Sequence, residues 1–246
     1  MLGLNRITAY LMIFFSIVLG GGSLLALIFF LVSGKTFSLN LGMEGLALLL
    51  FDGALSLLFF LQHSLMVRKG FKEWITRRIN PVYYSALFSI ASGLALFMLL
   101  LLWQKSDYII LIPLDWLIWV SQAAFLFSIV GFIWGIRSLG SFDPYGLGSI
   151  RRALKGKTTR PSPFIIKGPY KYVRHPLYSF FILMIWSHPY LTLDRLLFNF
   201  CWTLWIIVGS YWEEKDLVSV FGEAYLDYRK RVPMLIPGRL GKGLLS

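Results

Sequence analysis

The chain contains few of the residues on which soluble and metal-binding proteins depend. Of its 246 residues only 15% are charged, three are histidines and one is a cysteine, Cys201. One thiol excludes an internal disulfide, and this small set of ligands does not favour a structural zinc site. Because Cys201 lies in an apolar run, we expect a buried and inert thiol. No internal repeat or low-complexity linker divides the sequence, which predicts a single domain over residues 1–246.

Apolar sequence, by contrast, is present in excess. Hydrophobic residues make up 57% of the chain and the mean hydropathy is +0.68, whereas about a quarter of a soluble domain is charged. Apolar runs of roughly 20 residues span a bilayer as helices. We therefore predict an all-α integral membrane protein with five to six transmembrane helices. The runs cover residues 9–32, 44–66, 83–103, 115–137, 177–193 and 196–212.

Two of these runs carry features that modify the prediction. The first contains Gly20-Gly21-Gly22, and small residues at this position favour close helix packing or a bend. The fifth is interrupted by His188 and Pro189, so we expect it to be short or re-entrant.

Positive charge is distributed unevenly between the two ends of these runs. Of the 24 Lys and Arg residues, 21 lie at the N-terminus, in the 67–82 and 137–176 segments and after residue 212. Only Lys35, Lys105 and Arg195 lie on the other side. The positive-inside rule then places both termini and the long loops in the cytoplasm. The net charge of +12 is explained by topology and by attraction to membrane lipid rather than by nucleic-acid binding.

The second apolar run carries a polar stripe. Asp52, Ser56 and His63 are separated by four and seven residues, and at 100° per residue they share one helix face. The stripe is either the polar wall of a buried site, with His63 as a base or hydrogen-bond donor, or a set of interhelical hydrogen bonds that fixes packing. The sequence leaves both interpretations open.

The loop before the fifth run is rich in turn and helix-start signals. Asp143-Pro144-Tyr145-Gly146 predicts a turn in which Asp143 caps or closes the backbone, and residues 160–163 predict an extended linker. Pro176 suits the first turn of a helix. The amides of that turn are available to an anionic group, and Arg174 beside them has the fork that binds a carboxylate.

An acidic pair, Glu213-Glu214, follows the last apolar run. Two adjacent carboxylates can accept hydrogen bonds from a ribose or balance a cationic ligand, but they also suit a solvated helix end. Residues 221–233 then predict a short amphipathic element. Its aromatic side chains either close over a pocket or lie in the membrane interface.

Several of these motifs, taken together, carry a family resemblance. The sequences GPYKYVRHPLY at 168–178, EEKDL at 213–217 and FGEAYLDYRKRVPMLIP at 221–237 resemble the isoprenylcysteine carboxyl methyltransferase superfamily of membrane enzymes. Upstream, FFLQHSLMVRKGFKEW at 59–74 and SFDPYGL at 141–147 are similar to its methanethiol S-methyltransferase branch, which makes dimethyl sulfide in bacteria. A denitrification-associated membrane family shares the Gln-His-Ser motif. The superfamily resemblance covers about residues 138–237, and that of the branch most of the chain after residue 50.

The resemblance implies a specific enzyme. It predicts an S-adenosylmethionine-dependent methyltransferase of the bacterial inner membrane that methylates a small thiol such as methanethiol. The chain would comprise a four-helix part at 1–137, a methyltransferase core at 138–237 and a tail at 238–246, with the cytoplasmic loop and tail forming the cofactor site. The cofactor-binding residues implied are Tyr170, Tyr172, Arg174, His175, Pro176, Tyr178, Glu213 and Glu214. The candidate catalytic bases are His175, His63 and Asp143, which the sequence does not rank.

Two positions depart from the family pattern, and they bear on the acceptor more than on the methyl donor. Phe180 stands where the family has glycine, and we expect it to narrow or reshape the pocket beside the methyl donor. His188 stands where branch members have a small or hydroxyl residue. The alternatives are therefore another membrane-partitioning acceptor, such as hydrogen sulfide, an isoprenylated cysteine or a lipid, or a non-catalytic denitrification-associated membrane protein.

Overall fold

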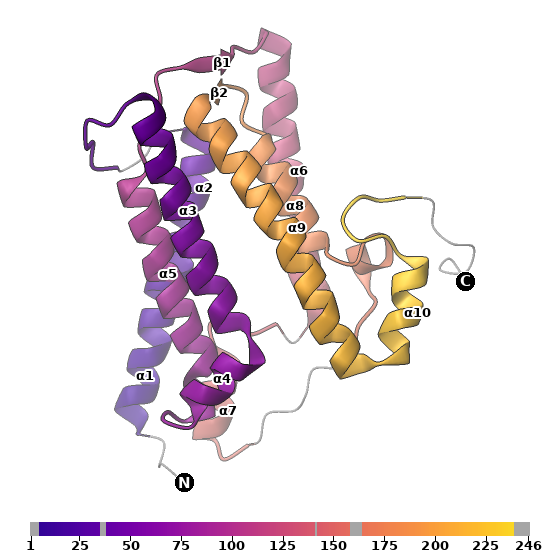
Figure 1. Ribbon diagram of the computed structural model, residues 1–246. Helices are drawn as coiled ribbons and strands as arrows, with labels where there is room; N and C mark the ends of the chain where they lie inside the picture. Colours follow the sequence, from indigo (N-terminus) through magenta and orange to yellow (C-terminus); the bar gives the residue numbers. More distant parts are fainter. Residues whose placement is uncertain (1–4, 35–37, 141, 158–163, 239–246) are drawn as a thin grey trace. The chain divides into compact units, whose positions relative to one another are not determined.

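The structure of the chain is a computed structural model that describes residues 5–34, 38–140, 142–157 and 164–238 (Figure 1). The contacts group the chain into two compact units. One consists of Met1–Ser106 with Asp143–Pro161, and the other of Asp107–Phe142 with Ser162–Ser246. The expected linker 160–163 and most of the expected tail, 239–246, lie outside the described residues.

The described chain is mainly helical and has four helices that are long and apolar enough to cross a membrane. They are Arg6–Ser33, Gly45–Val67, Pro81–Leu102 and Asp115–Leu139. These helices coincide with the first four predicted spans to within three residues and fit the expected all-α membrane class. Whether the remaining helices add one span or two stays a prediction.

The first unit is a bundle in which α5 packs against both the first span and α3 (Figure 1). Its elements are α1 (Arg6–Phe15), η1 (Ser16–Gly21), α2 (Gly22–Ser33), α3 (Gly45–Val67), α4 (Lys69–Thr76), η2 (Pro81–Tyr83), α5 (Tyr84–Leu102) and α7 (Leu147–Leu154). The short helix α7 packs on α1 and η2.

Glycines explain how closely the first span approaches α5. A Cβ atom on Gly20 would collide with the Ser89 hydroxyl, and one on Gly93 of α5 would collide with the Leu19 carbonyl. The same stretch forms the π-helical turn η1, which widens the helix where the two backbones meet. Close packing was one of the two outcomes expected for the three glycines, and the structure confirms it.

The second unit contains the rest of the elements. They are β1 (Ile109–Leu111), α6 (Asp115–Leu139), η3 (Gly168–Lys171), α8 (Pro176–Trp186), β2 (Leu191–Thr192), α9 (Leu193–Phe221) and α10 (Glu223–Arg231). Helix α8 packs against α6 on one side and against α9 on another, and α10 turns back beside the end of α9 (Figure 1). Cys201, on α9, is only partly buried.

Small residues on α6 receive large ones from α8. A Cβ on Gly131 would collide with the ring of Phe180, and a Cβ on Gly135 would lie 2.6 Å from Leu177 Cδ2. The Phe180 ring also meets Phe127 edge to face at 5.9 Å. Phe180 therefore packs into the surface of α6. Whether it also shapes a substrate pocket, as the sequence led us to expect, stays a prediction.

The fifth run forms a short helix, as His188 and Pro189 led us to expect, whereas two other features of this unit differ from the expected helix pair. Helix α8 ends at Trp186, and its 11 residues cover about 16 Å of a bilayer core of about 30 Å. Residues 191–192 instead pair antiparallel with β1, placing Thr192 opposite Ile109. Helix α9 continues to Phe221, past the expected end at 212, because no glycine or proline lies between 212 and Gly222, whose φ is 57°.

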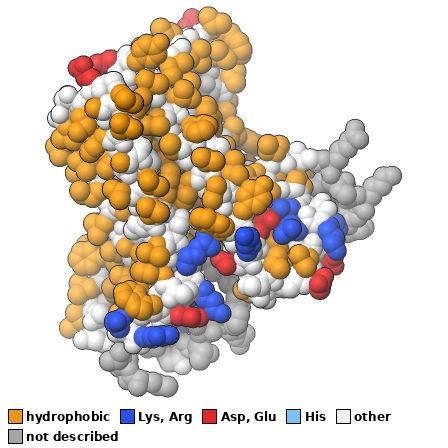
Figure 2. Space-filling view, in the orientation of Figure 1, with side chains coloured by type: hydrophobic (Ala, Val, Ile, Leu, Met, Phe, Trp, Pro, Cys, Tyr) orange, Lys and Arg blue, Asp and Glu red, His pale blue; other side chains and the backbone are white. Residues whose placement is uncertain are grey.

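The surface is consistent with a lipid environment. Figure 2 shows hydrophobic side chains over most of the long helices, with the Lys and Arg side chains gathered toward a few short segments. Leu46 and Trp119, for example, are 71% and 74% exposed. Apolar patches this extensive are rare on soluble monomers and indicate a face that contacts membrane.

Candidate functional site

The Arg174-His175-Pro176 element lies at the start of α8. Pro176 is the first residue of that helix and is buried, as its missing N–H predicts. His175 precedes it as the N-cap, with non-helical backbone angles. The preceding turn, η3, begins at Gly168, which has a φ of 56° and no room for a Cβ against Ser138. This glycine therefore sets the path by which the chain enters the site.

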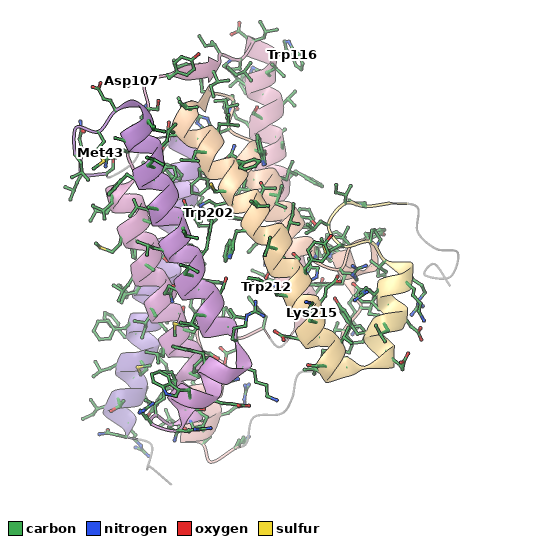
Figure 3. All side chains as sticks on the ribbon, viewed as in Figure 1. Met43, Asp107, Trp116, Trp202, Trp212 and Lys215 are labelled. Carbon is green, nitrogen blue, oxygen red and sulfur yellow. The ribbon has the colours of Figure 1, made fainter. Side chains whose placement is uncertain are left out.

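Helix α9 brings the acidic pair to this element. Glu213 and Glu214 lie within α9, between Trp212 and Lys215, which are labelled in Figure 3. Glu214 is 4% exposed, and its Oε1 accepts a hydrogen bond of 2.6 Å from Arg174 Nε. The pair predicted at the foot of a span thus lies nearly two turns inside a longer helix.

Arg174 is bound to protein groups on several sides. Besides the ion pair, its Nη1 donates to the carbonyl of Arg229 at 3.1 Å and to that of Val232. We expected its fork to bind a ligand carboxylate, which stays a prediction. The contacts here give it a second task, which is to fix Glu214 and the chain that follows α10.

His175 lies between the two carboxylates. Its Nε2 is 3.4 Å from Glu214 Oε1, and its Nδ1 is 3.8 Å from Glu213 Oε2. The ring is stacked on that of Tyr178, with centroids 5.5 Å apart. Burial lowers the pKa of His175 below its ordinary value of 6.5, although both carboxylates act to raise it. The imidazole is therefore neutral at pH 7 and can accept a proton.

Glu213 is held by a hydroxyl group rather than by a cation. Its Oε2 accepts a hydrogen bond of 2.8 Å from the Tyr178 hydroxyl, and its side chain is 41% exposed. No lysine or arginine in the described ranges forms an ion pair with it. Burial raises the pKa of the nearby Tyr170 hydroxyl, and the charge of Glu213 raises it further. Glu213 is thus a partly open carboxylate whose charge is not balanced.

An aromatic cluster supports the site from the C-terminal side. The ring of Phe164 lies among those of Phe221, Tyr225 and Tyr228, with centroids 5.1, 5.8 and 5.5 Å away. The Tyr228 hydroxyl donates to the carbonyl of Tyr170 at 2.5 Å. The aromatic residues of the expected amphipathic element therefore pack on the loop that enters the site. Tyr172, in contrast, is 43% exposed.

The other two candidate bases lie in the first unit. The His63 ring packs against Phe59 and Phe88, at 5.6 and 4.9 Å between centroids. Asp52 and Ser56 on the same helix are buried, which confirms the shared face. Asp52 Oδ1 accepts a hydrogen bond of 2.9 Å from the backbone N–H of Gln104, as expected if the stripe fixes packing.

Asp143 is bound to the start of α7. Its Oδ1 accepts from the Gly148 amide at 3.1 Å, and its Oδ2 accepts from the Ser149 amide at 2.8 Å and hydroxyl at 3.0 Å. The turn interpretation is confirmed by Gly146, whose amide donates to the Asp143 carbonyl and whose φ is 70°. A catalytic role for His63 or Asp143 stays a prediction.

Residues to which the sequence assigned no role also meet the site. The amides of Arg174 and His175 donate to the carbonyls of Pro233 and Met234, at 2.9 and 3.1 Å. Ser179, one turn into α8, donates to the Leu235 carbonyl at 2.6 Å. Such backbone pairings leave no pattern in a sequence, so the only signal was the inclusion of 231–237 in the family motif.

Comparison with known proteins adds a family to this geometry. Residues 53–216 match the model of the NnrU protein family. The chain is 33% identical over 245 residues to methanethiol S-methyltransferase 1 of Bradyrhizobium diazoefficiens, covering 96% of this chain and 82% of that protein. It is 38% identical over 199 residues to the methanethiol S-methyltransferase of Crocosphaera subtropica, covering 77% and 74%. Nurim of Rattus norvegicus is 27% identical over 181 residues, covering 70% and 69%. No solved structure matches the chain.

Proposed function

Because the chain belongs to the NnrU family, we propose that it is a membrane methyltransferase that uses S-adenosylmethionine to methylate a small thiol. Methanethiol is the proposed acceptor, and dimethyl sulfide the product. One observation carries the proposal: His175 lies within 4 Å of both carboxylates of the acidic pair. The names of the relatives, at 33% and 38% identity, support the reaction type and the acceptor.

The unbalanced negative charge of Glu213 suits a methyl donor that carries positive charge. Glu214 is already balanced by Arg174, whereas Glu213 is partly exposed and has no cationic partner in the part of the chain that the structure describes. A ligand that carries positive charge, or hydroxyls that donate hydrogen bonds, would satisfy it. We assign Glu213 to the methyl donor directly and Glu214 to the support of His175 and Arg174. The stacked pair of His175 and Tyr178 provides an aromatic wall.

S-adenosylmethionine, when bound, supplies a methyl group on a sulfonium centre whose positive charge disappears in the transfer. In the proposed reaction the thiol sulfur forms a bond to the methyl carbon, the bond from that carbon to the sulfonium breaks, and the thiol proton leaves. The thiolate is the nucleophile, so a base is needed. Holding the thiolate sulfur and the methyl carbon near contact distance contributes the rest of the rate enhancement.

His175 is the base that the geometry supports best. It is neutral at pH 7 because burial lowers its pKa. The tautomer with its proton on Nε2 directs that N–H toward Glu214 and leaves Nδ1 as the basic atom. Asp143 already accepts hydrogen bonds on both oxygens, and the His63 ring is packed between phenylalanines. We therefore propose His175 for the proton transfer.

The proposed location is the bacterial inner membrane with both termini in the cytoplasm. The asymmetry of Lys and Arg supports this orientation. The proposed donor site lies beside α10, whose last turn carries Arg229, Lys230 and Arg231. S-adenosylmethionine would then enter from the cytoplasm, while an apolar thiol would partition into the bilayer.

The test is a transfer assay with the purified full chain in lipid nanodiscs. S-adenosylmethionine with a labelled methyl group is mixed in turn with methanethiol, hydrogen sulfide and an isoprenylated cysteine. Volatile products are collected from the headspace, and non-volatile products are extracted into organic solvent. We expect labelled dimethyl sulfide from methanethiol. Transfer to another acceptor alone would replace the proposed substrate, and methyl-donor binding without product from any acceptor would overturn the enzymatic function.

A matched pair of variants tests the site. Glu213→Gln removes the unbalanced charge and should weaken binding of the methyl donor by about tenfold, the effect of losing a hydrogen bond to a charged group of about 1.5 kcal/mol. Glu223→Gln removes an exposed carboxylate from the first turn of α10 and should leave binding unchanged. Equal affinities for the two variants would contradict the assignment of Glu213.

A further inference from the structure

Four successive backbone carbonyls after α10 are all hydrogen bonded to one short element. The Val232 carbonyl accepts from the Arg174 side chain, and those of Pro233 and Met234 accept from the amides of Arg174 and His175. The Leu235 carbonyl accepts from the Ser179 hydroxyl at 2.6 Å. We name residues 232–236 the C-terminal strap.

The C-terminal strap has no regular structure of its own. Helix α10 ends at Arg231, and Pro233 has no amide to donate. Buried carbonyls need hydrogen-bond partners, and here residues 174–179 supply them. Exposure changes sharply along the strap, from 1% at Val232 to 81% at Ile236. The hydrogen bond from Ser179 thus secures the last attached residue before the chain emerges at the surface.

Ser179 has two carbonyls within reach of its single hydroxyl proton. That of His175, in the preceding turn of α8, is 3.1 Å away, and that of Leu235 is 2.6 Å away. A serine inside a helix commonly bonds to its own preceding turn. The shorter distance assigns the proton to Leu235, so this side chain connects the strap to α8.

The same residues that hold the strap form the proposed methyl-donor site. The Arg174 guanidinium contacts the Val232 carbonyl with one nitrogen and Glu214 with another. The amide of His175 is bonded to the strap, while its ring lies between the two carboxylates. If the strap detaches, the three hydrogen bonds that it makes to Arg174 and His175 are lost.

We infer that Ser179 is a positioning residue that latches the C-terminal strap to the methyl-donor site, so that strap docking and methyl-donor binding stabilise each other. The inference rests on the proposed function, because it requires that Arg174, His175 and the acidic pair bind the methyl donor. Coupling of this kind is reciprocal: a docked strap tightens binding, and a bound ligand holds the strap in place.

Binding and amide exchange test the latch in the full chain in nanodiscs. S-adenosylhomocysteine serves as the probe because it cannot transfer a methyl group. Ser179→Ala should weaken its affinity between about two- and tenfold, as expected for one lost hydrogen bond. It should also speed hydrogen exchange at the Arg174 and His175 amides. Ser179→Thr retains the hydroxyl and should restore both.

The control is Ser187→Ala, at the other end of α8, where the hydroxyl bonds to the Leu183 carbonyl of the same helix. It should change neither the affinity nor the exchange at residues 174 and 175. If Ser179→Ala binds the probe as the unaltered chain does, or if the probe binds without slowing exchange at these two amides, the latch is wrong. If the unaltered chain does not bind the probe at all, the proposed function itself fails, which is a different result.

Discussion

Arg174 and Glu214 form an ion pair with Nε and Oε1 2.6 Å apart, and their side chains are only 10% and 6% exposed. The more exposed Arg229 places its Nε 4.0 Å from the other oxygen of Glu214, Oε2. The pair joins the start of α8 to the middle of α9. It also neutralises one of two adjacent carboxylates, which leaves Glu213 as the carboxylate available to a ligand.

Breaking this pair from either side should be costly. We expect Arg174→Ala and Glu214→Ala each to lower the free energy of unfolding by about 3–5 kcal/mol, because each leaves a buried charge unpaired. The double variant should lose less than the sum. Arg174→Lys should not retain the stability of the unaltered chain. The ammonium group of lysine lacks the planar fork with which Arg174 contacts Glu214 and two carbonyls at once. Denaturant unfolding in detergent measures all four.

The comparison for that series is the exposed pair of Asp227 and Lys230 on α10, with side chains 59% and 71% exposed. Removing either should produce no measurable change in stability, because solvent screens such pairs. Strictly additive effects of Arg174→Ala and Glu214→Ala would show that the two side chains do not depend on each other.

The hydroxyl of Tyr178 should matter separately from its ring. Tyr178→Phe keeps the stack on His175 but removes the hydrogen bond to Glu213 Oε2. Since Glu213 is 41% exposed, its carboxylate should then turn toward solvent. We expect affinity for S-adenosylhomocysteine to fall about two- to tenfold, the effect of one hydrogen bond. Tyr211→Phe, at an exposed site of α9, is the matched change and should have no effect.

The lowered pKa of His175 should appear in the pH dependence of stability. The unfolded chain binds a proton near the ordinary value of 6.5, whereas the folded chain binds it only at lower pH. Between these two pKa values the unfolded state holds more protons, so the free energy of unfolding rises with pH. The stability that neutral His175 contributes is therefore full above 6.5 and lost as pH falls through its folded pKa.

Thermal midpoints of the unaltered chain and of His175→Gln, compared across this range, isolate that contribution. The unaltered chain should lose stability on acidification more steeply than the variant. A steeper loss in His175→Gln would mean that the charges of Glu213 and Glu214 outweigh the burial of the ring.

Adding a methyl group at Gly131 should overpack its contact with Phe180 and destabilise the fold. We expect Gly131→Ala to lower the free energy of unfolding by about 1–3 kcal/mol, since its methyl group collides with the ring. Adding Phe180→Ala should remove that clash. Gly209→Ala on α9 has open space around the new methyl group and should be neutral or stabilising. Denaturant unfolding of Gly131→Ala, Phe180→Ala, the double variant and Gly209→Ala tests this. A cost of Gly131→Ala that persists in the Phe180→Ala background would contradict it.

Asp143 should act on the local stability of α7. Asp143→Ala leaves the amides of Gly148 and Ser149 without their acceptor and should cost about 0.5–2 kcal/mol, as the loss of a helix cap does. Asp143→Asn keeps one acceptor oxygen and should cost less. Hydrogen exchange at residues 148 and 149 reports the change directly, with Asp107→Ala, an exposed site, as the control. Unchanged protection in Asp143→Ala would exclude the capping role.

The sequence predicted well those parts of the fold that depend on one dominant local signal. The first four apolar runs correspond to four long helices. Pro176 is the first residue of α8, as expected for a residue that has no backbone N–H to donate. Helix α9 runs past its expected end because the apolar run stops at 212, whereas the polar residues that follow continue the helix to Phe221. The pairing of β1 with β2 was missed because strands of two and three residues have no usable periodicity.

The candidate site was predictable in its members but not in their contacts. The motif resemblance named Arg174 and Glu214, yet nothing in the sequence showed that Arg174 is bound by protein groups on several sides. Ser179 was overlooked because a serine one turn into a helix ordinarily bonds to that helix. Every residue has a backbone carbonyl, so the amino-acid sequence of the C-terminal strap does not show which carbonyls accept hydrogen bonds from the site.

The fit of Phe180 against Gly131 makes the two positions dependent on each other. A Cβ atom at position 131 would collide with the Phe180 ring, so any larger residue there requires α6 and α8 to move apart or repack. Among sequences that keep this helix contact, we therefore expect the sizes of the two residues to vary in opposite directions.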